Sequence, residues 1–225
     1  VYSPLDALTL AEQYPERQIV FVGVGFETTT PLVAMAIKRA RAMGLTNFTV
    51  YGAHKNMPGA LEVIINDPAL KLDALILPGH VSTIIGAEPY RFLAEKYGIP
   101  GVITGFEPGD VLQGIAMIMR QLHEGRAEIE IAYARGVMPE GNPVALAAID
   151  EVFETCSATW RGLGEIPGSG YRIREEFADF DAMRRFQPDV EEVREHKGCR
   201  CGDVLRGIMA PSECPLFRTV CTPEN

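Results

Sequence analysis

The chain has 225 residues, 47% of them hydrophobic and 23% charged, which is the composition of a globular protein with a sizeable core. Its formal net charge is −9 and it has no Lys/Arg-rich run, so its field repels a phosphate backbone. The longest apolar stretches, Ile19 to Val24 and Ile115 to Met119, are far shorter than the ~20 residues of a membrane span. We therefore expect neither nucleic acid nor a membrane as a partner.

The first residues carry no targeting signal. Val1 stands where an initiator Met would stand, and the opening VYSPLDAL has neither a basic n-region nor an apolar h-region. We expect the chain to start at a cut rather than at a processed terminus. An acidic chain without a signal peptide also predicts a cytoplasmic protein.

Short apolar runs alternate with longer amphipathic segments through residue 124. The expected strands are Gln18–Val24, Phe48–Gly52, Ala74–Leu77 and Val102–Thr104. The expected helices are Pro31–Met43, Pro58–Asn66, Pro89–Tyr97 and Asp110–His123. Thr30 before Pro31 predicts an N-cap with proline at the first helical position. The alternation predicts the α/β class, with a doubly wound, Rossmann-like parallel sheet over residues 1–127.

The pattern changes after Ala127. A strand-like alternation is followed by a helix from about Pro143, a Gly/Pro-rich irregular stretch from Trp160 to Gly170, and a short charged helix over RIREEFADFDAMRRF. We interpret residues 128–225 as a smaller, irregular α+β domain that carries the cysteine-rich tail.

Ligands of parallel sheets bind at the carboxyl ends of the strands, so the loops after the expected strands are candidate sites. Glu27 and Glu107, which both follow Gly-Phe, either contribute to such a site or only complement helix dipoles. His80 and His54 either bind a ligand, relay a proton or contact a partner, or only order their loops. The four loops read GFETTTP from Gly25, GAHKNMP from Gly52, PGHVSTIIG from Pro78 and GFEPGD from Gly105.

Four of the five cysteines fall within the last 27 residues, at Cys199, Cys201, Cys214 and Cys221. In a cytosolic chain such clustering favours metal or redox chemistry over structural disulfides. Because no Cys-x₂-Cys knuckle and no intervening histidine is present, an iron–sulfur cluster is favoured over zinc, which stays open. In the Cys-x-Cys pair one thiol could bind metal and the other exchange disulfides, or all four could be ligands. Cys156 is interpreted as a lone thiol.

Several segments together resemble the HypD family of nickel–iron hydrogenase maturation proteins. They occur in the family's order and cover essentially the whole chain, ending in the tail CPLFRTVCTPEN. The segments are GFETTTP (25–31), PGHVSTIIG (78–86), GFEP (105–108), EGNPVA (140–145), IPGSG (166–170) and GCRCG (198–202).

The resemblance implies a scaffold on which the Fe(CN)2CO centre of nickel–iron hydrogenase is assembled, with a HypC-like chaperone and a HypE-like cyanide donor as partners. It also implies two similar α/β domains facing a cleft, and a third domain that holds a 4Fe-4S cluster similar to that of ferredoxin–thioredoxin reductase. This chain would supply the second α/β domain and most of the third. The family's amino-terminal domain, whose motifs hold the transient iron, is not in this sequence. We therefore expect a fragment that also lacks the extreme carboxyl end.

The same resemblance implies residue roles. Cys199, Cys214 and Cys221 match cluster-ligand positions, Cys201 matches a thiol that enters redox exchange, and His80 lies in the cleft-facing motif. Cys201 and His80 are accordingly the expected catalytic residues. The expected cofactor-binding residues are Glu27, Thr28 and Glu107.

Two other functions stay open at this point. One is a thiol–disulfide reductase of the ferredoxin–thioredoxin type, in which the cluster and Cys201 act on a disulfide substrate. The other is a structural zinc site that stabilises a small domain beside an α/β interaction surface. An accessory redox metalloprotein is expected rather than a catalyst that works alone.

Overall fold

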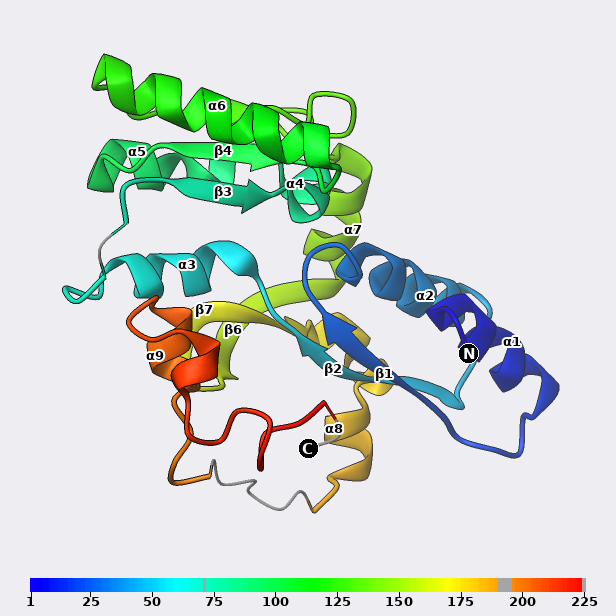
Figure 1. Cartoon of the computed structure of the whole chain (residues 1–225). Coiled ribbons are helices and arrows are strands. Elements are labelled where there is room, and N and C mark those ends of the chain that lie inside the picture. The colour runs from blue at the N-terminus through cyan, green and yellow to red at the C-terminus, as the bar shows by residue number, and fades with distance from the viewer. Residues whose placement is uncertain (71, 190–195, 224–225) are drawn as a thin grey trace.

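The computed structural model describes residues 1–70, 72–189 and 196–223. Parallel strands alternate with helices in a mixed α/β arrangement (Figure 1). No helix within these ranges is long and apolar enough to cross a membrane. The predicted α/β class is confirmed, and the predicted division near residue 127 stays a prediction. Residues 190–195 and 224–225 of the expected second domain lie outside the described ranges.

The first sheet consists of β1 (Ile19–Gly25) and β2 (Phe48–His54), which run parallel in register from Ile19 opposite Phe48. The crossover between them contains α2 (Thr30–Ala42), and α1 (Pro4–Gln13) precedes β1. Small side chains on one face of α2, such as Ala36 and Ala40, are fully buried in the core around the first sheet. Their size lets the helix pack closely, which fixes the loop that leads out of β1.

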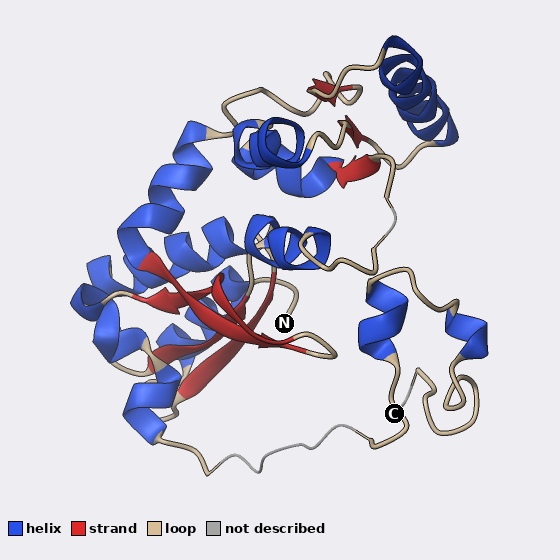
Figure 2. Cartoon of the chain, turned by 90° about the vertical axis from the view of Figure 1, so that its left-hand side faces the viewer, coloured by secondary structure: helices blue, strands red, loops and turns tan. Residues whose placement is uncertain are grey.

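The second sheet has the order β3–β4–β5, with all strands parallel. Its strands are β3 (Leu75–Pro78), β4 (Gly101–Thr104) and β5 (Ile129–Ile131). Figure 2 shows α6 (Pro108–Glu124) on one face of this sheet. The helical elements between β2 and β4 are α3 (Met57–Ile65), which precedes β3, and α4 (Gly79–Ile85), the 3₁₀ turn η1 (Glu88–Tyr90) and α5 (Arg91–Tyr97), which follow it.

A long antiparallel hairpin returns to the first sheet. After α7 (Pro143–Val152), β6 (Phe153–Trp160) and β7 (Gly164–Ile173) pair with each other. The Asn56 amide, just after β2, donates to the Ser169 carbonyl in β7 at 2.9 Å. The parallel strands thus lie in two sheets and the hairpin forms a third, with an isolated bridge between Lys55 and Gly170 linking it to the end of β2.

The carboxyl-terminal part is built from short elements. They are η2 (Glu175–Phe180), α8 (Ala182–Phe186), α9 (Cys201–Leu205) and η3 (Pro211–Glu213). Asp181 caps α8 by accepting from the Met183 amide at 2.9 Å. The predicted charged helix over residues 172–186 is therefore the end of β7, η2 and α8 in succession.

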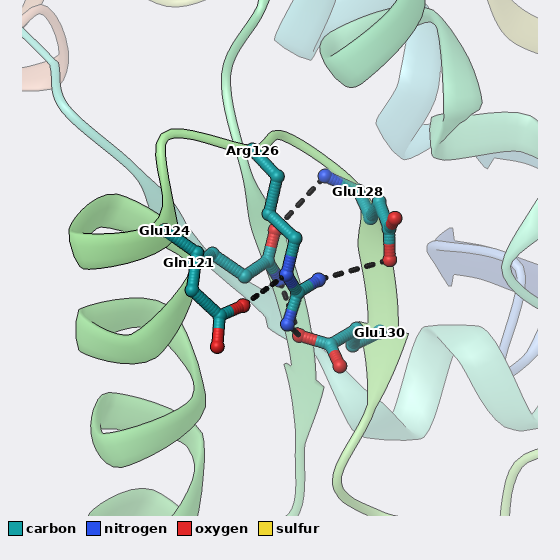
Figure 3. A network of polar contacts seen from close by, with 5 residues as sticks. All are labelled: Gln121, Glu124, Arg126, Glu128 and Glu130. Carbon is teal, nitrogen blue, oxygen red and sulfur yellow. Dashed lines mark hydrogen bonds and ion pairs between the residues drawn. The ribbon is translucent and has the colours of Figure 1, made fainter.

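A polar network fixes the carboxyl end of α6 to the strand that follows it (Figure 3). The Gln121 side chain, fully buried, donates to Glu130 in β5 at 2.6 Å and accepts from the Glu128 amide at 2.9 Å. Arg126 forms ion pairs with Glu124 at 2.6 Å and with Glu128 at 2.9 Å. Because the buried amide has both partners satisfied, α6 is held in one position on the sheet.

Candidate functional site

Glu27 in the β1–α2 loop is buried, with 1% of its surface exposed. Its Oε1 accepts the Met57 amide at 2.9 Å, at the first residue of α3, while Oε2 has no hydrogen-bond partner among the described residues. Burial raises the pKa of the Glu27 carboxyl, and the bond from Met57 opposes this rise. Glu27 therefore complements the dipole of α3, and not that of α2, which is the helix that follows Glu27 in sequence.

Glu27 lines a cavity of about 500 Å³ where the first sheet, the hairpin and the second sheet meet. Asn56 and Tyr171 also line it, and Glu88 and Glu140 contribute two further carboxylates. Burial, with a contribution from the charge of Glu27, raises the pKa of Tyr171 above its ordinary range. The cavity therefore combines acidic side chains with phenol and amide groups that can donate hydrogen bonds.

Thr28 is exposed, whereas the two threonines that follow it form hydrogen bonds. The hydroxyls of Thr29 and Thr30 donate to the Phe26 carbonyl at 3.1 and 2.9 Å. Thr29, and not the predicted Thr30, occupies the N-cap position of α2, and no side chain caps that helix. The N-cap prediction was wrong because these hydroxyls bond back to the preceding turn.

His80 lies in the first turn of α4, directly after β3, and is exposed. Its ring centroid is 4.5 Å from that of Phe106, which belongs to the loop after β4. Glu107, the N-cap residue of α6, is exposed and lies 3.5 Å from Arg135. Arg135 also binds both carboxylate oxygens of Asp110 at 2.6 Å. This pair fixes the loop after β4, next to which the imidazole of His80 and the carboxylate of Glu107 are exposed.

His54 ends β2 and is buried, with 2% of its surface exposed, whereas the sequence places it in a loop. Neither ring nitrogen has a hydrogen-bond partner within the described part of the chain. Its ring lies 5.9 Å from that of Phe153, and Gly23 on β1 leaves space for it. Burial lowers the pKa of His54 from 6.5 to about 4, so the imidazole is neutral near pH 7.

The thiols of the Cys-x-Cys pair are in contact. Cys201, the first residue of α9, is hydrogen-bonded to Cys199 through its side chain, and this bond, with partial burial, raises the pKa of Cys201. Cys221 lies close enough to raise this pKa further, while the positive charge of Arg161 opposes the rise. The five cysteines of the chain are all described, and all are free of disulfides.

The cysteine-bearing segment is attached to the hairpin and to α3. Arg206 pairs with Asp67, after α3, at 2.7 Å. A Cβ on Gly162, in the hairpin turn, would come within 2.5 Å of the Gly202 nitrogen, so two glycine backbones meet there. Cys214 follows η3, and its carbonyl accepts the Phe217 amide at 3.0 Å. The tail therefore has a defined place against the rest of the chain.

The donor set fits an iron–sulfur cluster in kind but not in arrangement. Cysteine thiolates are the ligands that such clusters use, and a 4Fe-4S cluster takes four of them. Cys199, Cys201 and Cys221 lie near one another. Yet across residues 1–70, 72–189 and 196–223 no group of three or more His, Cys, Asp or Glu side chains is placed to hold a metal ion.

The expected site residues thus fall into three separate groups. Glu27 lines the cavity between the sheets, His80 and Glu107 lie on the exposed loops after β3 and β4, and the thiols lie in the tail. Sequence reasoning missed Tyr90 and Arg135. Tyr90 is fully buried, and its hydroxyl lies near the side chains of Ser82 and Glu27. No motif marks either residue, because each acts through a contact far away in sequence.

Comparison with known proteins gives one family over the full length. The HypD family, described as the hydrogenase formation hypA family, matches residues 1–225. A hydrogenase maturation factor HypD from Rhodobacter capsulatus is 50% identical over 229 residues, which cover 100% of this chain and 61% of that protein. The factor of the same name from Cupriavidus necator is 47% identical over 232 residues, with the same coverage of both chains.

An archaeal relative extends the comparison. A putative hydrogenase expression/formation protein from Methanocaldococcus jannaschii is 42% identical over 227 residues, covering 100% of this chain and 63% of that protein. The chain therefore spans about three fifths of the length of the curated relatives that it matches. With the family matched over all 225 residues, the chain belongs to the HypD family.

Proposed function

We propose that the chain contributes to a hydrogenase maturation factor, as a scaffold on which the Fe(CN)2CO centre of nickel–iron hydrogenase is assembled. The observation that carries this proposal is the family match over every residue of the chain, with relatives named hydrogenase maturation factors. HypC-like and HypE-like proteins are the proposed partners. Iron with cyanide and carbon monoxide ligands is the proposed cargo and not a resident cofactor.

The cavity and the two exposed loops are the proposed contact points with cargo and partners. Glu27 offers one carboxylate oxygen without a hydrogen-bond partner, and its raised pKa favours a held proton at that atom. His80 and Glu107 present an imidazole and a carboxylate on a loop fixed by the Arg135–Asp110 pair. Buried groups suit proton transfer to a small cargo, and exposed groups suit docking of a protein. Thr28 stays a proposed cofactor contact by its exposure beside Glu27.

The Cys199–Cys201 contact supports a second candidate function, a thiol–disulfide reductase. Oxidation of the two thiols to one disulfide releases two electrons and two protons, and a substrate disulfide takes them up to become two thiols. The raised pKa of Cys201 keeps that thiol protonated near pH 7, which lowers its reactivity as a nucleophile. Attack on a substrate requires loss of this proton, which the nearby Arg161 favours.

A resident 4Fe-4S cluster is part of the proposal by donor chemistry alone. It would use Cys199, Cys214 and Cys221, together with a ligand that the sequence does not identify. Bound there, such a cluster would supply single electrons. Because the thiols are not placed around a metal, the cluster requires the tail to rearrange when iron and sulfide bind.

Metal content tests the cluster directly. Iron, sulfide and zinc are measured in protein reconstituted without oxygen, for the unchanged chain, Cys214→Ser and the control Cys156→Ser. About four irons and four sulfides per chain, lost in Cys214→Ser and kept in Cys156→Ser, are expected. Stoichiometric zinc without sulfide contradicts the redox proposal. If neither metal binds, the cluster is withdrawn for this chain.

Turnover and partner binding separate the two functions. The scaffold proposal expects binding to a HypC-like protein and no turnover of a disulfide substrate by the isolated chain. The reductase alternative expects turnover that Cys201→Ser abolishes and Cys156→Ser does not. Turnover without binding to the partner would overturn the scaffold proposal.

A further inference from the structure

An apolar groove runs along the outer edge of the second sheet. Leu75 and Ile76 of β3 form its floor, Val111 of α6 lines one side, and Met57 and Leu61 of α3 line the other. Its volume is about 430 Å³. Figures 1 and 2 show β3 between α6 and α3. Among the described strands β3 pairs only with β4, so the groove lies at a free sheet edge.

The flank of α6 beside this groove is apolar along the whole helix. The buried face of α6 is formed by Asp110, Gly114, Ile118 and Gln121. A rotation of about 100° per residue places Val111, Ile115 and Leu122 together on one side of that face, with Met119 next to them. Val111 lines the groove, so this flank is the one that faces it. Ile115, Met119 and Leu122 are nevertheless 43%, 59% and 41% exposed.

The opposite flank of α6 is largely polar, although Met117 also lies on it, half-buried next to the buried face. Glu124 and Arg126 belong to the ion-pair network that reaches β5 (Figure 3). Gln113 and Arg120, on the same side, are polar and exposed. An isolated surface helix would carry its polar residues toward solvent on both sides. The asymmetry indicates that another element covers the groove side.

The β3 edge is apolar. Its sequence, LILP, carries no charge, and its shortness and the terminal Pro78 leave little room for pairing with a further strand. Ile76 lies beside Val102 in the sheet, so their side chains share one face. That face is the one that α6 covers, because a Cβ on Gly114 of α6 would contact Val102. Ile76 is still 48% exposed. The sheet face next to α6 is therefore apolar and uncovered.

We propose that this groove holds an amphipathic helix that lies on Ile76 and packs alongside α6, supplied by the two fifths of the HypD-family chain that this sequence does not span. Apolar residues at helical spacing on that helix would contact Ile115, Met119 and Leu122. The flank from Val111 to Leu122 is only about three turns long. The apolar area of so short a flank is smaller than the ~800 Å² that each partner of a stable complex buries. It is sufficient for a segment tethered in the same polypeptide, because tethering raises the effective concentration of that segment.

Cysteine labelling tests the occupant. The full-length Rhodobacter capsulatus relative is made with this sequence in place of its matched region, and compared with the 225-residue chain. Ile115→Cys is placed in both, and Gln113→Cys, on the polar flank of the same helix, is the matched control. Maleimide labelling at each site is followed by peptide mass spectrometry. We expect labelling at position 115 to be at least tenfold slower in the full-length protein, and labelling at position 113 to be equal in both.

Several results would overturn this assignment. Equal labelling at position 115 in both proteins means that no segment of the longer chain covers the flank. Protection in the 225-residue chain that grows with its concentration assigns the groove to a second copy, and protection only after another protein is added assigns it to that partner. Should Ile115→Cys fail to fold, hydrogen exchange of the unsubstituted proteins replaces it. Slower exchange in β3 and α6 of the longer protein is then expected, and unchanged exchange refutes the proposal.

Discussion

Replacement of His54 by leucine is expected to remove most of the acid sensitivity of folding between pH 7 and pH 4.5. The imidazole is buried beside Phe153 with neither nitrogen bonded, and burial lowers its pKa from 6.5 to about 4. The unfolded chain therefore binds a proton at this residue below pH 6.5, and the folded chain does so only near pH 4. His54 contributes stability that is complete above pH 6.5 and is lost as the pH falls toward 4.

The expected size follows from the shift. A difference of about 2.5 pH units, at about 1.4 kcal/mol for each unit, gives roughly 3 kcal/mol in full, most of it lost by pH 4.5. Glu27 acts in the opposite direction, because its raised pKa gives stability below pH 4.5 that is lost as the pH rises. That contribution is present in both proteins, so it cancels in the difference between them.

Urea unfolding followed by the fluorescence of Trp160, the only tryptophan, measures the free energy at pH 7, 5.5 and 4.5. The gap in stability between the unchanged chain and His54→Leu should shift by about 2–3 kcal/mol in favour of the variant on acidification. His123→Gln, at an exposed position in α6, is the control and should leave the gap constant. A gap that does not change with pH for His54→Leu would refute the buried, unpaired state of the imidazole.

Five further substitutions, two of which serve as matched comparisons, probe single contacts by the same urea unfolding at pH 7. Thr49→Val removes a buried hydroxyl without a hydrogen-bond partner, so it should leave the free energy of unfolding unchanged or raise it by up to about 1 kcal/mol. Thr30→Val removes the hydroxyl that donates to the Phe26 carbonyl, so it should lower the free energy of unfolding by about 1 kcal/mol. Gly86→Ala should lower the free energy of unfolding by more than about 2 kcal/mol, because φ is +75° and the added Cβ would lie 2.2 Å from a carbonyl oxygen. Gly44→Ala, at φ +68° but with open space around the added Cβ, should lower it by about 1 kcal/mol or less. Asn56→Ala removes the cap of α3 and a bond to the hairpin, at about 1–3 kcal/mol, and a loss below 0.5 kcal/mol would contradict the observed bonds.

The sequence predicts local structure well where periodicity is long and the ends are marked. Pro108 at the start of α6 and the apolar period through residue 123 give that helix within a few residues of its bounds. The stretch from Trp160 to Gly170 was expected to be irregular, yet residues from Gly164 onward form β7. Pairing decides this, because Gly170 lies opposite Cys156 and its missing side chain leaves room for Ala158. Local composition could not predict a strand that depends on its partner.

The number of sheets could not be predicted either. Alternating strands and helices fix the α/β class, but they do not determine which strands are neighbours. The order observed here depends on contacts such as the Asn56 amide to the Ser169 carbonyl, between residues more than a hundred positions apart. These two positions lie in different sequence motifs, GAHKNMP and IPGSG, and each motif alone is a turn signal. A single sheet over residues 1–127 was the simplest arrangement that the alternation allowed.

The candidate site shows the same division between residue identity and arrangement. Gly-Phe-Glu occurs twice, and the sequence treats the two carboxylates alike. The structure buries Glu27 against the start of α3, whereas Glu107 is exposed beside Arg135. Burial is the physical difference, because it raises the pKa of Glu27, whereas Glu107 is exposed to solvent. The repeated motif therefore marks two carboxylates in different electrostatic environments.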